Sequence, residues 1–228
     1  MIERLKSLRG KLETRTLVLL LALVGVPWLF LAVADEVAEG ETAAIDRSLL
    51  LAFRTPGRPS DPIGPRWLEE SVRDITALGG FTVLTLLTIV ATLLLLFHQR
   101  RREALIFAAT VIAAQISSQL LKGLYERERP SLVAHGSYVY SHSFPSGHSA
   151  MAAAVFLTLA TVVASVEERR RTKALIYGLA IIGVLGVGVS RVYLGVHWPT
   201  DVLGGWALGT SWALVGWLIL GLTGPRRS

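Results

Sequence analysis

The chain of 228 residues contains no cysteine, which excludes disulfide bonds, thiolate catalysis and zinc sites built on cysteine. Charged residues are also scarce, at 18% of the chain against 52% hydrophobic residues, and the mean hydropathy is +0.51. A soluble domain of this length carries more charge and fewer apolar residues. We find neither an internal repeat nor a low-complexity tract, so we expect one integral membrane domain over residues 1–228.

The sequence contains several long apolar runs. Several approach or exceed the ~20 residues that span a bilayer as a helix, and they lack the alternation of barrel strands. We therefore predict an all-α bundle of six transmembrane helices. The expected spans are Thr16–Ala34, Ile75–Phe97, Ala104–Leu121, Gly147–Val166, Ala174–Ser190 and Val202–Leu222.

Two parts of the N-terminal third allow further expectations. The first span ends in Ala32-Val33-Ala34 and resembles a cleavable signal peptide, but its apolar run is long for one and we expect a retained span. The proline-rich segment 35–74 is predicted to be an extracytoplasmic loop. Within it, Ile45–Phe53 and Trp67–Val72 are candidates for short amphipathic helices on the membrane surface.

The basic residues indicate the orientation of the bundle. A net charge of +6 is compatible with nucleic-acid binding, but these residues lie between apolar spans, so we expect membrane lipids and no nucleic acid as partners. Their groups at 4–15, 100–102, 169–173 and 226–227 fall on one side of the predicted bundle. Because cytoplasmic ends carry excess Lys and Arg, both termini are predicted inside, and segments 35–74, 122–146 and 191–201 outside. This bias, without organelle signals, indicates a bacterial inner membrane.

The stretch HWPTD carries a candidate catalytic pair. His197 and Asp201 are four residues apart and share one face if the helix includes this turn. The carboxylate can then accept the Nδ1–H of the imidazole and leave Nε2 as a nucleophile or base. Taken alone, this spacing fits helix capping with an incidental surface histidine at least as well.

The stretch FPSGHS combines a helix start with a histidine. A helix that begins at Ser146 or Gly147 presents free amides, which attract anions together with the helix dipole. His148 in the first turn is placed to act on that anion as a proton donor. The alternative is Ser146 as an ordinary N-cap beside a structural histidine.

The stretch KGLYERERP supplies cations. Lys122 and Arg129 are seven residues apart, about two turns if the helix persists, which places both on one side. Arg191 adds a third cation at the end of the fifth span. Such residues often extend their charged ends toward the membrane interface without further function, and we expect Glu126 and Glu128 to be solvated. Three cations near two histidines would nevertheless suit a phosphate group.

Together these residues form three motifs: Lys122…Arg129-Pro130, Pro145-Ser146-Gly147-His148 and Ser190-Arg191…His197…Asp201. In spacing and order the sequence resembles the type 2 phosphatidic acid phosphatase (PAP2) superfamily, whose soluble relatives include vanadium haloperoxidases. The motif core covers residues 122–201. The resemblance implies a six-helix PAP2-type bundle and a phosphatase acting on a lipid phosphate or diphosphate at the outer face of the membrane.

The resemblance also implies roles for the motif residues. His197 would attack phosphorus, Asp201 would orient His197, and His148 would protonate the leaving oxygen and then activate water. The phosphoryl oxygens would be held by Lys122, Arg129, Arg191 and the amides of Ser146 and Gly147, so neither a metal nor another cofactor is expected.

The substrate remains open among undecaprenyl diphosphate, phosphatidylglycerol phosphate, phosphatidate and lipid A phosphate. His135, Tyr138, Tyr140 and His142 either shape this choice or form plain loop surface. The competing functions are a vanadate-dependent haloperoxidase and an anion- or lipid-binding transporter.

Overall fold

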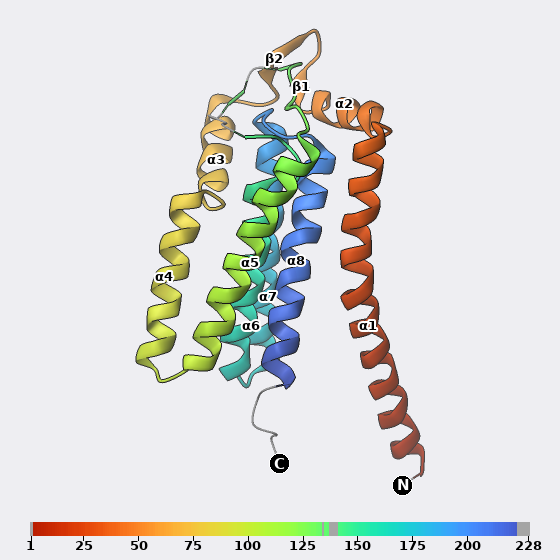
Figure 1. Cartoon of the computed structure of the whole chain (residues 1–228), viewed down its shortest axis with the longest axis vertical. Helices are drawn as coiled ribbons and strands as arrows, with labels where there is room; N and C mark the ends of the chain where they lie inside the picture. Colours follow the sequence, from red (N-terminus) through yellow and green to blue (C-terminus); the bar gives the residue numbers. More distant parts are fainter. Residues whose placement is uncertain (1, 134, 137–140, 223–228) are drawn as a thin grey trace.

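The computed structural model describes the backbone of residues 2–133, 135–136 and 141–222, and within these ranges the side chains of residue 17 and of residues 19 onward. These ranges form helices and one two-stranded hairpin (Figure 1). In chain order the elements are α1 (Ile2–Glu39), α2 (Ala43–Leu51), β1 (Arg54–Thr55), β2 (Arg58–Pro62), α3 (Arg66–Ala77), α4 (Phe81–Phe97), α5 (Arg101–Tyr125), α6 (Gly147–Val166), α7 (Arg170–Tyr193) and α8 (Pro199–Leu222). The predicted all-α bundle is confirmed.

The spans agree with the prediction with one correction. Five helices are long and apolar enough to cross a bilayer, namely α5, α6, α7, α8 and the Leu19–Glu39 part of α1. A sixth candidate is the pair α3 and α4, which passes the same test of length and hydropathy only when its two helices are taken together across a bend of 45°. The continuous helix predicted for Ile75–Phe97 is therefore wrong, because the chain breaks around Gly79 and Gly80. Two glycines weaken a helix, and a Cβ on Gly79 would collide with Val187 of α7.

The segment between α1 and α4 is more ordered than predicted. The predicted helix at Ile45–Phe53 is present as α2, but α3 is longer than Trp67–Val72 and packs on α7 instead of standing apart on the membrane surface. Residues 54–62, expected as loop, pair as the antiparallel hairpin β1–β2 around Gly57, whose φ of +76° suits glycine. Buried Arg54 ties this hairpin to α7 by donating from Nη1 to the Tyr193 carbonyl over 2.8 Å.

Small residues allow α6 and α8 to pack closely at the centre of the bundle. α6 contributes buried alanines, among them Ala150 and Ala153, and α8 contributes glycines. A Cβ on Gly209 would collide with the Ala150 carbonyl, and one on Gly205 would lie 2.6 Å from the Ser146 carbonyl. Small residues at such crossings let two helix backbones approach within a membrane. The close crossing brings the start of α6 against the start of α8.

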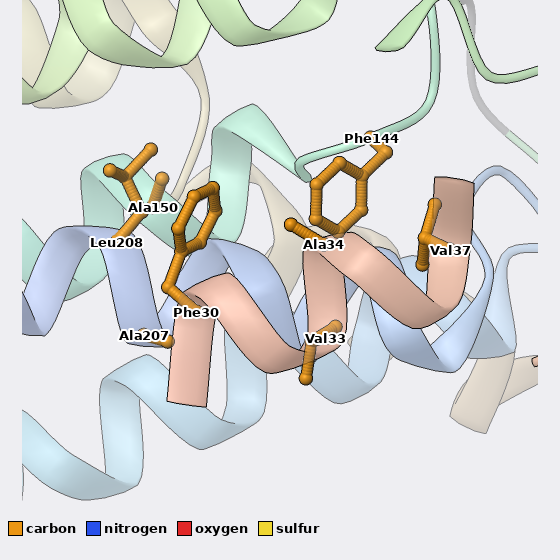
Figure 2. Close-up of a cluster of buried hydrophobic side chains, with 8 residues drawn as sticks. All are labelled: Phe30, Val33, Ala34, Val37, Phe144, Ala150, Ala207 and Leu208. Carbon is orange, nitrogen blue, oxygen red and sulfur yellow. The ribbon is translucent and has the colours of Figure 1, made fainter. Parts of the chain in front are cut away.

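The C-terminal half of α1 covers α8. Phe30, Val33, Ala34 and Val37 of α1 form one buried cluster with Phe144, Ala150, Ala207 and Leu208 (Figure 2). The Phe30 and Phe144 rings stack with centroids 6.0 Å apart. Since Phe144 directly precedes the PSGH motif, α1 supports the loop that enters α6. In Figure 1 the N-terminal half of α1 diverges from the bundle.

The two ends of the bundle differ in chemistry. The loops at residues 98–100 and 167–169, which carry predicted cytoplasmic arginines, lie at the same end as the beginning of α1 (Figure 1). The hairpin, α2 and the turn between α7 and α8 lie at the opposite end. All three motifs contribute residues at this second end, while residues 226–227 lie outside the described part of the chain.

Candidate active site

The turn between α7 and α8 holds the candidate nucleophile. His197 lies just before α8 with 2% of its surface exposed, and Asp201 lies in the first turn of α8 and is fully buried. The His197 Nδ1 atom is 3.3 Å from Asp201 Oδ2, which also accepts the backbone N–H of Trp198 over 2.8 Å. The predicted side-chain pair is therefore present, and this geometry favours the tautomer with the proton on Nδ1.

Arg129 faces the other nitrogen of His197. Its Nη1 lies 3.1 Å from His197 Nε2 and also donates to the Val196 carbonyl over 2.6 Å. A guanidinium only donates, so Nε2 is the acceptor and carries a lone pair. Burial, followed by the charges of Arg129, Arg191 and Lys122, holds the pKa of His197 well below its usual range. Geometry and electrostatics thus agree on a neutral His197.

Arg129 does not reach this position by the predicted route. α5 ends at Tyr125, and Glu126 adopts the left-handed conformation with φ of 44°, so Lys122 and Arg129 do not lie on one helix. Arg129 lies instead on the irregular segment after α5, and its Nε donates to the Ser141 carbonyl over 2.7 Å. The prediction that these cations act on the same side survives for a different reason, since both line one cavity.

Arg191 and Lys122 complete the set of cations. Arg191, at the end of α7, is 2% exposed and donates from Nη1 to Thr76 Oγ1 over 3.0 Å. Its buried Nε has no hydrogen-bond partner among the described residues. Lys122 donates from Nζ to the His142 carbonyl over 2.6 Å. Buried cations of this kind need an anion or a fixed dipole beside them.

The start of α6 contributes Gly147 and His148 to the same cavity. Ser146 differs from the prediction, because its backbone N–H donates to the Asp201 carbonyl over 2.9 Å and is engaged within the protein. Its hydroxyl accepts a hydrogen bond from Ser149 and makes no side-chain cap. Neither a free Ser146 amide for phosphate nor the simple N-cap alternative is supported. Ser146 joins the starts of α6 and α8.

One cavity connects these groups with the membrane-facing side of the bundle. Its volume is about 670 Å³, and six candidate residues line one end: Lys122, Arg129, Gly147, His148, Arg191 and His197. The remainder runs between α4 and α5, past Phe81, Ile89 and Ile116, all exposed on the bundle surface. A polar end and an apolar extension together suit an amphiphile with a negatively charged head.

Several residues near the site were missed by the sequence reasoning. Arg127 forms ion pairs with both Asp46 and Asp201, and Thr76 holds Arg191. An acidic Asp46 within the predicted amphipathic segment was the available sequence signal, although it identified no partner.

The loop candidates contribute less directly. His135 Nε2 lies 2.7 Å from the Pro130 carbonyl, and His142 acts through its backbone carbonyl. Glu126 and Glu128 are exposed as predicted, whereas Tyr138 and Tyr140 lie outside the described residues.

Comparison with known proteins places this geometry in a family. The family model described as "PAP2 superfamily" matches residues 103–223. A Bacillus subtilis protein named phosphatidylglycerophosphatase B is 36% identical over 63% of this chain and 70% of its own. A Sulfolobus acidocaldarius protein named undecaprenyl-diphosphatase is 31% identical over 46% of this chain and 47% of its own.

A solved structure agrees with these matches. The crystal structure of a transmembrane PAP2-type phosphatidylglycerolphosphate phosphatase from Bacillus subtilis superposes with a TM-score of 0.82 and 28% identity, over 91% of this chain and all of that one. The likeness therefore covers the bundle as well as the motif core. On the family match and the shared fold, this chain is a member of the PAP2 superfamily.

Proposed function

We propose that this protein is a metal-independent lipid phosphatase that removes a phosphate group from a membrane lipid at the outer face of a bacterial inner membrane. The observation that carries the proposal is the shared cavity, in which a neutral His197 and three cations adjoin a membrane-facing extension. The phosphate head would occupy the polar end while the hydrocarbon chain lies between α4 and α5. Both named relatives are lipid phosphatases by name.

The reaction would proceed in two displacements. His197 Nε2 attacks phosphorus, the bond from phosphorus to the leaving oxygen breaks, and His148 gives that oxygen its proton. Water then attacks the phosphohistidine, His148 takes up the proton, and the P–N bond breaks to release inorganic phosphate. Arg129, Arg191 and Lys122 would stabilise the charge on the three phosphoryl oxygens.

The dimensions of the cavity fit one hydrocarbon chain. Its lining on α5 extends from Lys122 to Ala108, which at the rise of a helix is about 21 Å. One leaflet of the hydrocarbon core is about 15 Å thick. The cavity is therefore deep enough to accompany a lipid chain through its own leaflet.

Polar side chains in the upper part of the cavity support a glycerophospholipid. Gln119 and Gln115 lie one and two turns below Lys122 on α5, and Thr85 lies opposite on α4. Glutamines at this depth are costly unless they bind a polar group. The acyl esters of phosphatidate lie just below its phosphate, and in phosphatidylglycerol phosphate a polar glycerol and a phosphodiester come between the terminal phosphate and these esters. A polyprenyl diphosphate has only hydrocarbon below its diphosphate. We therefore expect a glycerophospholipid, rather than undecaprenyl diphosphate, to be the better substrate.

A phosphate-release panel in detergent tests the proposal. Wild type should release phosphate from phosphatidylglycerol phosphate, His197→Ala should lose at least about 10³-fold in rate, and orthovanadate but not EDTA should inhibit. A strict metal requirement, or wild-type turnover by His197→Ala, would contradict the mechanism. Bromoperoxidase activity on added vanadate would instead support the haloperoxidase alternative.

The lipid class has a sharper test. Diester and diether phosphatidates differ in the two ester carbonyls, so wild type should prefer the diester and Gln115→Leu/Gln119→Leu should lose that preference. An equal ratio of diester to diether turnover in the two proteins would reject the contact between the glutamines and the esters, without contradicting the phosphatase activity.

A further inference from the structure

Arg127 lies in the sequence between Lys122 and Arg129, but it is not one of the residues that define this family motif. Its side chain forms ion pairs with two buried carboxylates. Nη1 donates to Asp201 Oδ1 over 2.6 Å, and Nη2 donates to Asp46 Oδ2 over 2.7 Å. The Asp46 and Asp201 side chains are exposed by 1% and 0%, so the guanidinium provides a counter-charge that water does not.

The Arg127 guanidinium makes further contacts beside these two ion pairs. Nη1 also donates to Thr200 Oγ1 over 2.9 Å, and Nη2 to Thr42 Oγ1 over 3.0 Å. Its carbon lies 5.9 Å from the ring centroid of Trp198, within range of a cation–π contact. Only a planar fork with several donors satisfies this arrangement, which a lysine would not reproduce.

Asp46 is held as firmly as Arg127. Its Oδ1 accepts the backbone N–H of Thr200 over 2.9 Å, and its Oδ2 accepts the Thr200 hydroxyl over 2.6 Å. Thr200 lies in the first turn of α8, next to Asp201. Asp46 therefore anchors α2 to the start of the helix that carries the partner of the nucleophile.

The contacts of Asp201 show what Arg127 does for the site. Oδ2 faces His197 Nδ1 and the Trp198 amide, while Oδ1 accepts from Arg127. Without Arg127, Oδ1 would lose this donor, the carboxylate could rotate, and two buried negative charges would lose the cation between them. An Asp201 that rotates or takes up a proton no longer holds His197 with its proton on Nδ1.

We propose that Arg127, anchored by Asp46, is a positioning residue of the phosphatase reaction, which keeps Asp201 ionised and oriented toward His197. Arg127 is not among the described residues that line the cavity. It therefore acts through Asp201 and does not touch the phosphate. The inference rests on the proposed function and extends it to the α2 segment. Other residues also interact electrostatically with Asp201 or His197, namely Lys122, Arg129, His148 and Arg191.

The test compares kcat, KM and the pH profile of kcat for purified wild type and Arg127→Gln. At metal sites, loss of a residue that orients a ligand typically costs about 10–100-fold, and we take this as the analogy. We expect a fall in kcat of that size with KM within about twofold, and the acidic limb of kcat moved to higher pH. An unchanged kcat and pH profile per folded molecule would overturn the proposal. Inactive wild type would instead reject the proposed function.

Three further variants keep the test decisive if Arg127→Gln folds poorly. Arg127→Lys retains the charge without the fork and should recover part of kcat. In Asp46→Asn, Asp201 is the one remaining carboxylate of the two that pair with Arg127, so the acidic limb of kcat should not move to higher pH. Arg127→Gln/Asp46→Asn removes one of the two carboxylates and should move the limb back toward wild type. The same shift in all three would contradict the charge argument.

Arg54→Gln is the matched control. Arg54 is also a buried arginine near this end of the bundle, but it donates to the carbonyls of Phe53 and Tyr193 rather than to a carboxylate. Its loss should lower thermal stability and leave the pH profile of kcat in place. If Arg54→Gln shifts the profile as Arg127→Gln does, the effect is general destabilisation and the positioning role is rejected.

Discussion

Arg129 Nη1 lies 3.1 Å from His197 Nε2, and this single contact fixes which nitrogen of the histidine carries the lone pair. The guanidinium cannot accept a hydrogen bond, so Nε2, the nitrogen that we propose as the nucleophile, is the one that carries the lone pair. The proton then lies on Nδ1 toward Asp201. A phosphate that enters the cavity meets the lone pair and the cation together.

The neutral state of His197 predicts how stability depends on pH. Burial and the neighbouring cations lower the pKa of His197 in the folded protein, while in the unfolded chain it is about 6.5. Between these values the unfolded state binds more protons, so the free energy of unfolding falls as pH falls below about 6.5. Wild type is therefore expected to have a lower Tm at pH 5 than at pH 7.5 through this group.

His197→Asn isolates that contribution. Asparagine keeps a donor for Asp201 but does not titrate, so its Tm should fall less than that of wild type between pH 7.5 and 5. Thermal unfolding followed by tryptophan fluorescence in detergent measures the difference. Parallel pH dependences for the two proteins would show that His197 is not held neutral.

Thr76 gives a second prediction because it positions Arg191 from outside the motif core. Thr76→Val keeps the size of the side chain but removes the oxygen that accepts from Arg191 Nη1 over 3.0 Å. We expect kcat/KM to fall about tenfold, compared with about 10²–10³-fold for Arg191→Gln. Thr161→Val, on α6, is the control, since Thr161 bonds only with Leu157 and Tyr177 in the described part of the chain. Equal effects of the two threonine variants would rule out positioning by Thr76.

The sequence predicted the residues of the site better than the residues that hold them in place, for a physical reason. His197 and Asp201 are close in sequence, so their pairing follows from helix geometry alone. The contacts of Arg127 with Asp46 and of Arg191 with Thr76 join residues far apart in the chain, and no local spacing encodes them. The sequence grouped Lys122 with Arg129 through an assumed continuous helix that is absent, so of the two sequence arguments only the resemblance remains as support for this grouping.

The fold, like the site, was predicted where local sequence signals decide it and not where tertiary contacts do. Apolar runs located the spans, since a bilayer imposes their length. The bend at Gly79 depends on the approach of Val187 from α7, and the hairpin at 54–62 depends on the anchor from Arg54 to Tyr193. Such tertiary contacts override the local signals of proline and hydropathy.

The extension of the cavity between α4 and α5 predicts a chain-length effect. Ile116 lines it and is 55% exposed, whereas Leu105 on the same helix is 70% exposed and is not found among the lining residues. Ile116→Trp should raise KM several-fold for a long-chain phosphatidate and leave a dioctanoyl analogue nearly unchanged. Leu105→Trp should alter neither. A loss that is equal for both chain lengths would mean that the chain lies elsewhere.

The orientation of the protein can be tested with single cysteines, because the chain has none of its own. Ser60 is exposed on β2 at the end that carries the site, and Glu168 is exposed in the loop between α6 and α7 at the opposite end. In intact bacterial cells a membrane-impermeant maleimide should label Ser60→Cys and should label Glu168→Cys only after the inner membrane is permeabilised. The basic groups at 100–102 and 169–173 favour this orientation through the positive-inside rule. The reverse pattern would place the site in the cytoplasm, where it would act on lipids of the inner leaflet.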